Sequence, residues 1–276
     1  MLRKVYLEIT NVCNLACAFC PGTGRAPRFL SGSEFHTLAG KLRGHTEYLY
    51  FHLMGEPLLH PELAELLRIA GSMGYKVMIT TNGTLLDRAG ETLLRSPAVH
   101  KVNVSLQSFE GNRGEDPATY IASCAGFAKR AAEAGKFCEL RLWNGGGLDS
   151  RNGEIQTLLA AVFPPPWPNS RNGLKLRERV WLEPGDRFDW PDLAAEDRGG
   201  RRFCYGLRDQ VGVLVDGTVV PCCLDHEGDM ALGNLFESDL EDLLAGDRAR
   251  AIREGFSRRQ AVEPLCRRCG YSLRFT

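Results

Sequence analysis

The sequence lacks an excess of charge of either sign. Lysine plus arginine and aspartate plus glutamate each number 34, so the formal net charge of the 276 residues is zero. A protein that binds nucleic acid through the phosphates normally carries a marked excess of basic residues. Nucleic acid is therefore not an expected partner. With 43% hydrophobic and 25% charged residues, the composition also excludes an intrinsically disordered chain.

Long hydrophobic segments are missing as well. No apolar run approaches the ~20 residues that a membrane span requires. The first ten residues are typical of a short strand and not of a signal peptide. We therefore expect a soluble, cytoplasmic protein without a membrane partner. Because internal repeats and low-complexity tracts are also lacking, the length predicts one or two globular domains.

Strand-like and helix-like segments alternate through the first two thirds of the chain. The clearest expected helices are 61–73 and 118–134, and the expected strands are 5–10, 48–54, 76–81, 101–106, 137–142 and 174–182. Such alternation is typical of parallel strands joined by helical crossovers. It predicts an α/β fold over residues 1–198, either an open doubly wound sheet or a partial barrel.

A second unit is expected over residues 199–276. Strands 211–215 and 218–222 are predicted to form a hairpin through Asp216-Gly217, the kind of two-residue turn that such a pairing favours. If Val215 pairs with Thr218, Cys222 lies opposite Val211. A helical segment, 238–255, then leads to Cys266.

Ten cysteines are present, and in a cytosolic protein clustered cysteines indicate metal ligands more often than disulfides. Cys124 and Cys138 stand alone and are expected in the core. The other eight form three groups, which are Cys13, Cys17 and Cys20, then Cys204, Cys222 and Cys223, then Cys266 and Cys269. Three thiolates on one loop leave a metal position open for chemistry, although a structural zinc site completed by a distant ligand is an alternative.

Polar segments follow the expected strands where those strands end. They are Gly55, Glu56 and Pro57 after the second strand, Asn82 after the third, Ser105 and Gln107 at the fourth, and Arg141 and Asn144 at the fifth. In a barrel of parallel strands the carboxyl ends form the reactive face. We therefore expect these segments and the first cysteine loop to converge on one rim.

The ordered combination of Cys13-x3-Cys17-x2-Cys20, Gly55-Glu56-Pro57 and Thr81-Asn82-Gly83 resembles the radical S-adenosylmethionine (SAM) enzymes. The resemblance implies a partial (β/α)6 TIM-like barrel. It also implies that Cys13, Cys17 and Cys20 hold a 4Fe-4S cluster whose fourth iron binds SAM. Reductive cleavage of SAM then yields a deoxyadenosyl radical that takes a hydrogen atom from the substrate. A reducing electron donor such as flavodoxin or ferredoxin is an expected partner.

The same resemblance gives roles to other cofactor-binding residues. It places Phe19 beside the adenine, Gly55, Glu56 and Pro57 at the SAM amino group, and Asn82 in the neighbouring motif. Ser105 and Gln107 are similar to ribose-contacting positions, and Arg141 and Asn144 to positions that contact the SAM carboxylate. Met54 departs from the family pattern, which has glycine there. The alternatives are an ordinary turn at residues 55–57 and, for Arg141, a surface charge or an ion pair.

The later cysteines, Cys204-x12-Gly217-x4-Cys222 and Cys266-x2-Cys269, resemble the shortened SPASM, or twitch, domain of some radical SAM enzymes. Four thiolates suit either zinc or a 4Fe-4S cluster. The resemblance implies a small β-hairpin plus helix domain with one auxiliary 4Fe-4S cluster on Cys204, Cys222, Cys266 and Cys269. Asp225, His226 and Glu227 are candidates for a base that deprotonates the substrate, with a solvated loop as the alternative.

The expected function is dehydrogenase-like oxidation of a small-molecule or peptide substrate with help from the auxiliary cluster. An alternative within the family is a maturase that forms a thioether or carbon–carbon crosslink in a ribosomally synthesised peptide. The early first strand leaves no room for an N-terminal peptide-recognition domain, which weakens that alternative. The alternative of another class is a non-catalytic iron–sulfur or zinc scaffold.

Overall fold

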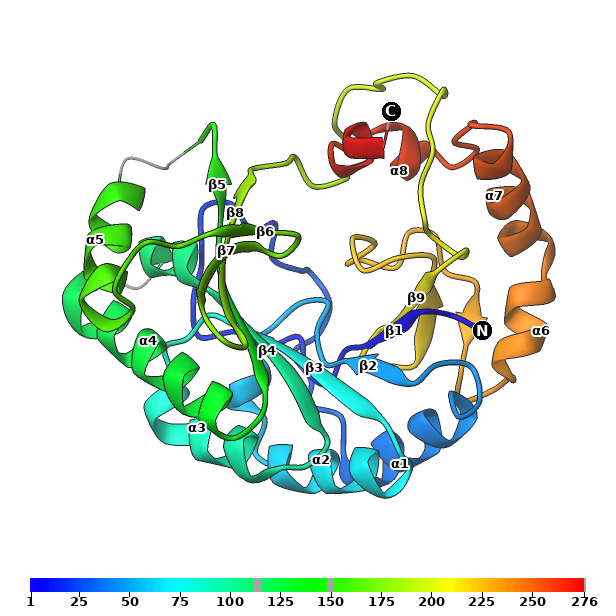
Figure 1. The fold of residues 1–276 in the computed structure, drawn as a ribbon. Helices are drawn as coiled ribbons and strands as arrows, with labels where there is room; N and C mark the ends of the chain where they lie inside the picture. Colours follow the sequence, from blue (N-terminus) through cyan, green and yellow to red (C-terminus); the bar gives the residue numbers. More distant parts are fainter. Residues whose placement is uncertain (112–115, 148–150, 276) are drawn as a thin grey trace.

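The structure, a computed structural model, describes residues 1–111, 116–147 and 151–275. Its central feature is a sheet in which six neighbouring strands run parallel, in the order β1-β2-β3-β4-β5-β8 (Figure 1). These strands are β1 (Lys4–Leu7), β2 (Tyr48–Tyr50), β3 (Lys76–Thr81), β4 (Val99–Ser105), β5 (Phe137–Gly145) and β8 (Val180–Asp186). The expected partial (β/α)6 barrel is confirmed.

Five helices connect these strands and cover the outer face of the sheet (Figure 1). They are α1 (Gly32–Lys41), α2 (Leu63–Ser72), α3 (Leu86–Arg95), α4 (Pro117–Glu133) and α5 (Asn152–Val162). Local sequence sets the helix starts: Ser31 and Glu34 form a capping box before α1. At α4, the Asp116 side chain accepts a hydrogen bond from the Thr119 backbone, and Pro117 occupies the first turn.

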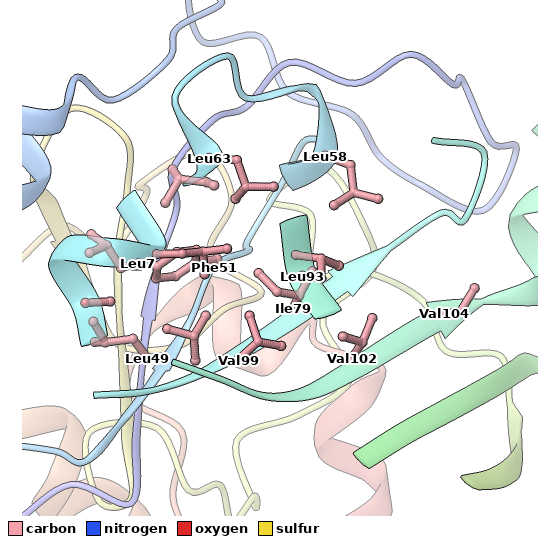
Figure 2. Packing of buried hydrophobic residues seen from close by; sticks show 14 of the residues in the cluster. Leu7, Leu49, Phe51, Leu58, Leu63, Ile79, Leu93, Val99, Val102 and Val104 are labelled. Carbon is pink, nitrogen blue, oxygen red and sulfur yellow. The ribbon is translucent and has the colours of Figure 1, made fainter. Parts of the chain in front are cut away.

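The main hydrophobic core lies between the helices and the sheet. Leu49, Phe51, Ile79 and Val102 are fully buried in it (Figure 2). Because side chains alternate along a strand, the other sheet face carries different residues. On β4, Val102 and Val104 are in the core, whereas Asn103 and Ser105 line a cavity. Apolar residues thus anchor each strand from outside and leave polar residues on the inside of the barrel.

The expected single strand 174–182 is wrong. Residues 173–186 form an antiparallel pair, β7 (Gly173–Arg177) and β8, and β6 (Asn169–Ser170) extends it. Arg179 in the connecting turn has a φ of 65°, which breaks the apolar run into two strands. Of β6, β7 and β8, only β8 pairs with β5, and this pairing is parallel.

The C-terminal unit continues the same sheet. Strand β9 (Gln210–Val213) pairs in parallel with β1, β10 (Thr218–Val220) pairs antiparallel with β9, and β11 (Gly233–Asn234) completes the series of 11 strands. The barrel and the C-terminal unit therefore share one hydrogen-bonded sheet. A domain boundary near residue 199 stays a prediction.

The expected register of this hairpin is wrong by one residue. Val219 pairs with Val213 and Val220 with Gly212, and the Leu214 N–H donates to the Thr218 carbonyl at 2.8 Å. The connection is a three-residue loop, residues 215–217, with Gly217 at a φ of 87°. The Val215 N–H donates instead to the Glu8 carboxylate at 2.9 Å. This contact removes Val215 from the strand ladder.

The expected helix 238–255 is two helices, α6 (Leu240–Ala245) and α7 (Asp247–Ser257). Gly246, with an extended ψ of 158°, ends the first and begins the second. The short helices α8 (Pro264–Arg267), η1 (Pro57–Leu59), η2 (Leu106–Gly111) and η3 (Tyr271–Phe275) complete the fold. None of the helices in the described residues is long and apolar enough to cross a membrane.

Candidate functional site

A cavity of about 730 Å³ lies on the inner side of the partial barrel. Phe19, Ser105 and Gln107 line it, as do Cys204, Cys222, Cys223, Cys266 and Cys269 of the C-terminal unit. Residues as far apart in sequence as Phe19 and Cys269 therefore face one cavity. The site has one wall from each unit.

The first cysteine loop follows β1. Cys13 and Cys20 are exposed and Cys17 is partly buried, and the Cys20 N–H donates to the Cys17 carbonyl at 3.0 Å. The loss of water around the thiols raises the pKa values of Cys13 and Cys20. The Asn11 side chain closes the loop, because its amide donates to the Ala26 carbonyl at 2.9 Å and its oxygen accepts the Arg28 N–H at 2.8 Å.

Glu56 lies beside this loop and is 1% exposed. Its carboxylate accepts the Leu58 N–H at 2.9 Å and the Asn82 N–H at 2.7 Å, and burial raises its pKa to about 7. Gly55, at a φ of 76°, permits the close approach: a Cβ there would lie 2.5 Å from the Thr10 carbonyl oxygen. Each Glu56 oxygen keeps acceptor capacity for an ammonium group, so the expected SAM contact is chemically consistent.

Three further expected SAM contacts, Phe19, Ser105 and Gln107, line the cavity. Within the described part of the chain, Gln107 Oε1 is buried without a hydrogen-bond partner. A buried acceptor without a partner is costly unless a ligand supplies a donor. A ribose hydroxyl is such a donor, so the residues fit the adenosine of SAM. Asn82 contacts the first cysteine loop, since its side-chain amide donates to Asn14 at 2.9 Å and lies 3.9 Å from Cys13 Sγ.

Arg141 and Asn144 are placed differently. Arg141 lines the cavity, but its guanidinium pairs with Glu139 and Glu183, each at 3.0 Å, and stacks on Trp143. The ion-pair alternative for Arg141 is therefore what the structure contains. Asn144 is buried and exchanges hydrogen bonds with Asn152 at 2.9 and 3.0 Å. Their contacts with a SAM carboxylate stay predictions.

The second set of thiols gathers at the opposite wall. Burial raises the pKa values of Cys222 and Cys266 well above normal, and neighbouring thiols raise them further. Cys223 and Cys204 act on Cys222, and Cys204 and Cys269 act on Cys266. The described residues contain no group of three or more Cys, His, Asp or Glu side chains arranged to hold a metal ion. The donor set of four neighbouring thiols is nevertheless of the type that holds an iron–sulfur cluster or zinc.

The three candidates for a base lie outside the cavity lining. Asp225 is fully buried, and its carboxylate accepts the N–H groups of Asp229 and Met230, both at 2.9 Å. Glu227 accepts the Gly24 N–H at 3.0 Å, and His226 packs edge-on against Trp190. These contacts join the loop after Cys223 to the segment after Cys20. The structure gives no support for any of them as the base.

Sequence reasoning missed a polar network on the cavity wall. The Asn103 amide donates to Thr80 Oγ1 at 3.2 Å, and Thr80 Oγ1 lies 3.3 Å from His52 Nε2. Burial and the charges of Arg141 and Lys4 lower the pKa of His52 to about 3. The pattern Asn103-x-Ser105-x-Gln107, with polar residues at every second position, is the sequence signal that points to this face.

A buried ion pair, Glu8 with Arg25, was also missed. Glu8 is fully buried and accepts two hydrogen bonds from Arg25 at 2.7 and 2.8 Å. Its carboxylate also accepts the N–H groups of Met54 at 3.1 Å and Val215 at 2.9 Å. One carboxylate thereby joins β1, the segment after the cysteine loop, the Gly55-Glu56-Pro57 turn and the C-terminal hairpin.

Comparison with known proteins agrees with this arrangement. A family model described as the radical SAM superfamily matches residues 7–129, and one described as an iron-sulfur cluster-binding domain, SPASM, matches residues 204–270. The GTP 3',8-cyclase of Microcystis aeruginosa is 34% identical over 90% of this chain and 90% of its own. A probable GTP 3',8-cyclase of Methanocella arvoryzae is 37% identical over 130 residues, which are 39% of its length. The chain therefore belongs to the radical SAM superfamily and carries a C-terminal SPASM domain.

Solved structures show the same fold. BtrN in an open conformation has a TM-score of 0.59 at 17% identity, over 98% of this chain and 92% of its own. Streptococcus suis SuiB bound to SAM has a TM-score of 0.64 at 18% identity, over 92% of this chain and 68% of its own. The protein is thus a radical SAM enzyme whose cofactors are SAM and 4Fe-4S clusters.

Proposed function

We propose that the protein is a dehydrogenase-like radical SAM oxidoreductase whose substrate binds in the cavity that Phe19 of the first cysteine loop and the C-terminal thiols line. The observation that carries this proposal is the lining of that cavity. Phe19, Ser105 and Gln107 face it from the SAM side, and the thiols of the C-terminal unit face it from the other side. A substrate held there would contact both the source of the radical and an electron acceptor.

The proposal gives each set of thiols its own cluster. Cys13, Cys17 and Cys20 would hold the SAM-binding 4Fe-4S cluster, and Cys204, Cys222, Cys266 and Cys269 the auxiliary one. When bound, these groups supply a deoxyadenosyl radical and an acceptor for one electron. Glu56 would accept the SAM ammonium group, and Gln107 a ribose hydroxyl. The aromatic side chains Phe19 and Trp143 on the cavity wall would keep water from the reacting atoms.

The proposed reaction is a two-electron oxidation of the substrate. With SAM and both clusters bound, a substrate carbon bearing a hydroxyl or amine would lose one hydrogen atom to the deoxyadenosyl radical, which is released from SAM together with methionine. It would also lose one proton to solvent and one electron to the auxiliary cluster that Cys204, Cys222, Cys266 and Cys269 would hold. A carbonyl or imine and 5'-deoxyadenosine are formed. The single electron that cleaves SAM comes from a reduced flavodoxin or ferredoxin. Four thiol ligands leave no open iron on the auxiliary cluster, which suits electron transfer better than substrate binding.

The relatives leave the substrate class open. The names of the similar proteins include GTP 3',8-cyclase and AdoMet-dependent heme synthase, and SuiB was solved bound to a precursor peptide. Small molecules and peptides are therefore both tested as substrates.

The deciding experiment is anaerobic incubation of the reconstituted protein with SAM, dithionite and a deuterated cell extract. We expect 5'-deoxyadenosine that carries deuterium, and a product lighter than its substrate by two hydrogens. A Cys13→Ala variant is the control and should form no deoxyadenosine. A crosslinked peptide product would replace the dehydrogenase proposal with a maturase. Absence of SAM cleavage by protein with both clusters loaded would overturn the catalytic proposal.

A further inference from the structure

The cavity wall carries more positive than negative charge. Its lining includes the cations Arg3, Lys4, Arg141 and Arg187 and the acid Asp209. Arg3 pairs with Asp209 at 3.5 Å, and Arg141 pairs with two glutamates. In the described ranges, no carboxylate lies within ion-pair distance of Lys4 or Arg187. Lys4 and Arg187 thus face the cavity without a direct ion pair, although Asp209 interacts with Lys4 over a longer distance.

The Lys4 ammonium group lies against two tyrosine rings. Lys4 begins β1, where it pairs with Gln210 of β9, and its Nζ lies 5.2 Å from the centre of the Tyr6 ring and 5.4 Å from that of Tyr50. The two aromatic faces hold the ammonium group in place but do not neutralise it. A partly buried ammonium group without a counter-ion gains strongly from a bound anion.

The positive charge of this region also affects the pKa of His52. His52 lies edge-on to both tyrosine rings, and the charges of Arg141 and Lys4 add to burial in lowering its pKa. His52 is therefore neutral near pH 7 and adds no charge of its own to this region. A substrate ammonium group is disfavoured here by the charges of Arg141 and Lys4.

We propose that Lys4 is an anion-binding residue that holds a carboxylate or phosphate group of the substrate, with Arg187 as a second cation on the cavity wall. The proposal rests on the proposed function only in taking this cavity as the substrate site. It assigns the substrate to the class of anionic small molecules or acidic peptides. A competing role for Lys4 is to offset the charge of the auxiliary cluster, because Lys4 interacts electrostatically with Cys223.

The test uses the holoenzyme and three probes with similar carbon skeletons, which are glucose, gluconate and glucose 6-phosphate. Binding is followed at fixed ionic strength by the fluorescence of the cavity residues Trp143 and Trp190, compared with variants in which each is replaced by Phe. We expect at least one of the two anions to bind roughly tenfold or more tightly than glucose. Lys4→Met should remove that preference and Arg187→Met should reduce it. Lys129→Met is the matched control, because Lys129 is exposed on α4 and does not line the cavity, and it should keep the preference.

Each outcome decides the proposal. Equal binding of the three probes, no measurable binding of either anion, or an unchanged preference in Lys4→Met would overturn it. If Lys4→Met instead only lowers the midpoint potential of the auxiliary cluster, Lys4 serves the cluster. Which anion is preferred distinguishes a carboxylate from a phosphate. Formation of 5'-deoxyadenosine, measured separately, reports on the proposed function and does not depend on these probes.

Discussion

At the scale of single residues, Glu56 offers the sharpest test of the SAM site. Its carboxylate is buried and already accepts two backbone N–H groups. Glu56→Gln keeps the size but removes the charge opposite the SAM ammonium group. We expect SAM affinity to fall roughly tenfold or more, a loss of about 1–3 kcal/mol, with unchanged iron content.

Equilibrium binding of SAM under anaerobic conditions measures this change in affinity. Glu62→Gln, at an exposed neighbour, should bind SAM normally; equal affinity in both variants would show that Glu56 does not contact SAM.

His52 makes the stability of the protein depend on pH. Its folded-state pKa of about 3 lies below the ordinary value of 6.5, so below pH 6.5 the unfolded state binds a proton that the folded state does not. The stabilising contribution is therefore present above pH 6.5 and is lost as the pH falls. Between pH 6.5 and pH 5 it amounts to up to about 2 kcal/mol.

The measurement is anaerobic urea unfolding of the holoenzyme across this range. His52→Gln should show a flatter pH dependence than the wild type, whereas His36→Gln, on the exposed face of α1, should follow the wild type. A parallel pH dependence in all three proteins would mean that His52 titrates normally.

At the scale of elements, the C-terminal hairpin decides which of two adjacent thiols binds the auxiliary cluster. Cys222 and Cys223 follow the end of β10 at Val220, in a bend and a turn, and both thiols line the cavity. Cys222 interacts electrostatically with Cys223, Cys204 and Cys266. The Cys223 thiol interacts first with Lys4 and Tyr6, and less strongly with Cys269. Cys223→Ala should keep about eight irons per chain, and Cys222→Ala should lose part or all of one cluster of four. Anaerobic iron and sulfide analysis of both variants tests this, and the reverse pattern would exchange the two roles.

Some of these elements could be predicted from the sequence and others could not. Strands β1 to β5 and helices α2 and α4 could be predicted because their hydrophobic periodicity is local. The separation of β7 from β8 could not, since it depends on a turn at Arg179 with positive φ. The hairpin register depends on a bond between Val215 and Glu8, 207 residues apart. The motif loops were found from residue types, whereas His52 and Lys4 belong to no motif and become site residues only through the barrel.

At the scale of the whole molecule, the two sets of thiols lie in different parts of the chain and should load independently. Replacing Cys13, Cys17 and Cys20 by Ala should abolish deoxyadenosine formation while leaving roughly four irons per chain. The signal of the remaining cluster in electron paramagnetic resonance should match one of the two wild-type signals. Complete loss of iron would show that the C-terminal site cannot form without the first. Continued deoxyadenosine formation would contradict the assignment of the radical-generating cluster.

The Glu8–Arg25 pair connects these two parts. Glu8 bonds to Arg25, Met54 and Val215, and Arg25 bonds in turn to the His226 carbonyl at 2.8 Å. Both halves of the site therefore depend on one buried carboxylate. In Glu8→Gln the Arg25 charge stays buried without its counter-charge, and removing one partner of such a pair costs about 3–5 kcal/mol.

We expect Glu8→Gln to lower the free energy of unfolding by that amount and to reduce the iron content at both sites. Urea unfolding and iron analysis of the reconstituted protein measure the two effects. Glu65→Gln is the control, because the Glu65–Arg68 pair is exposed on α2, and it should change neither quantity measurably. Reduced stability with full iron loading would show that Glu8 supports the fold without positioning the cluster loops. Unchanged stability would show that the Arg25 guanidinium is solvated in the variant and not left buried without a counter-charge.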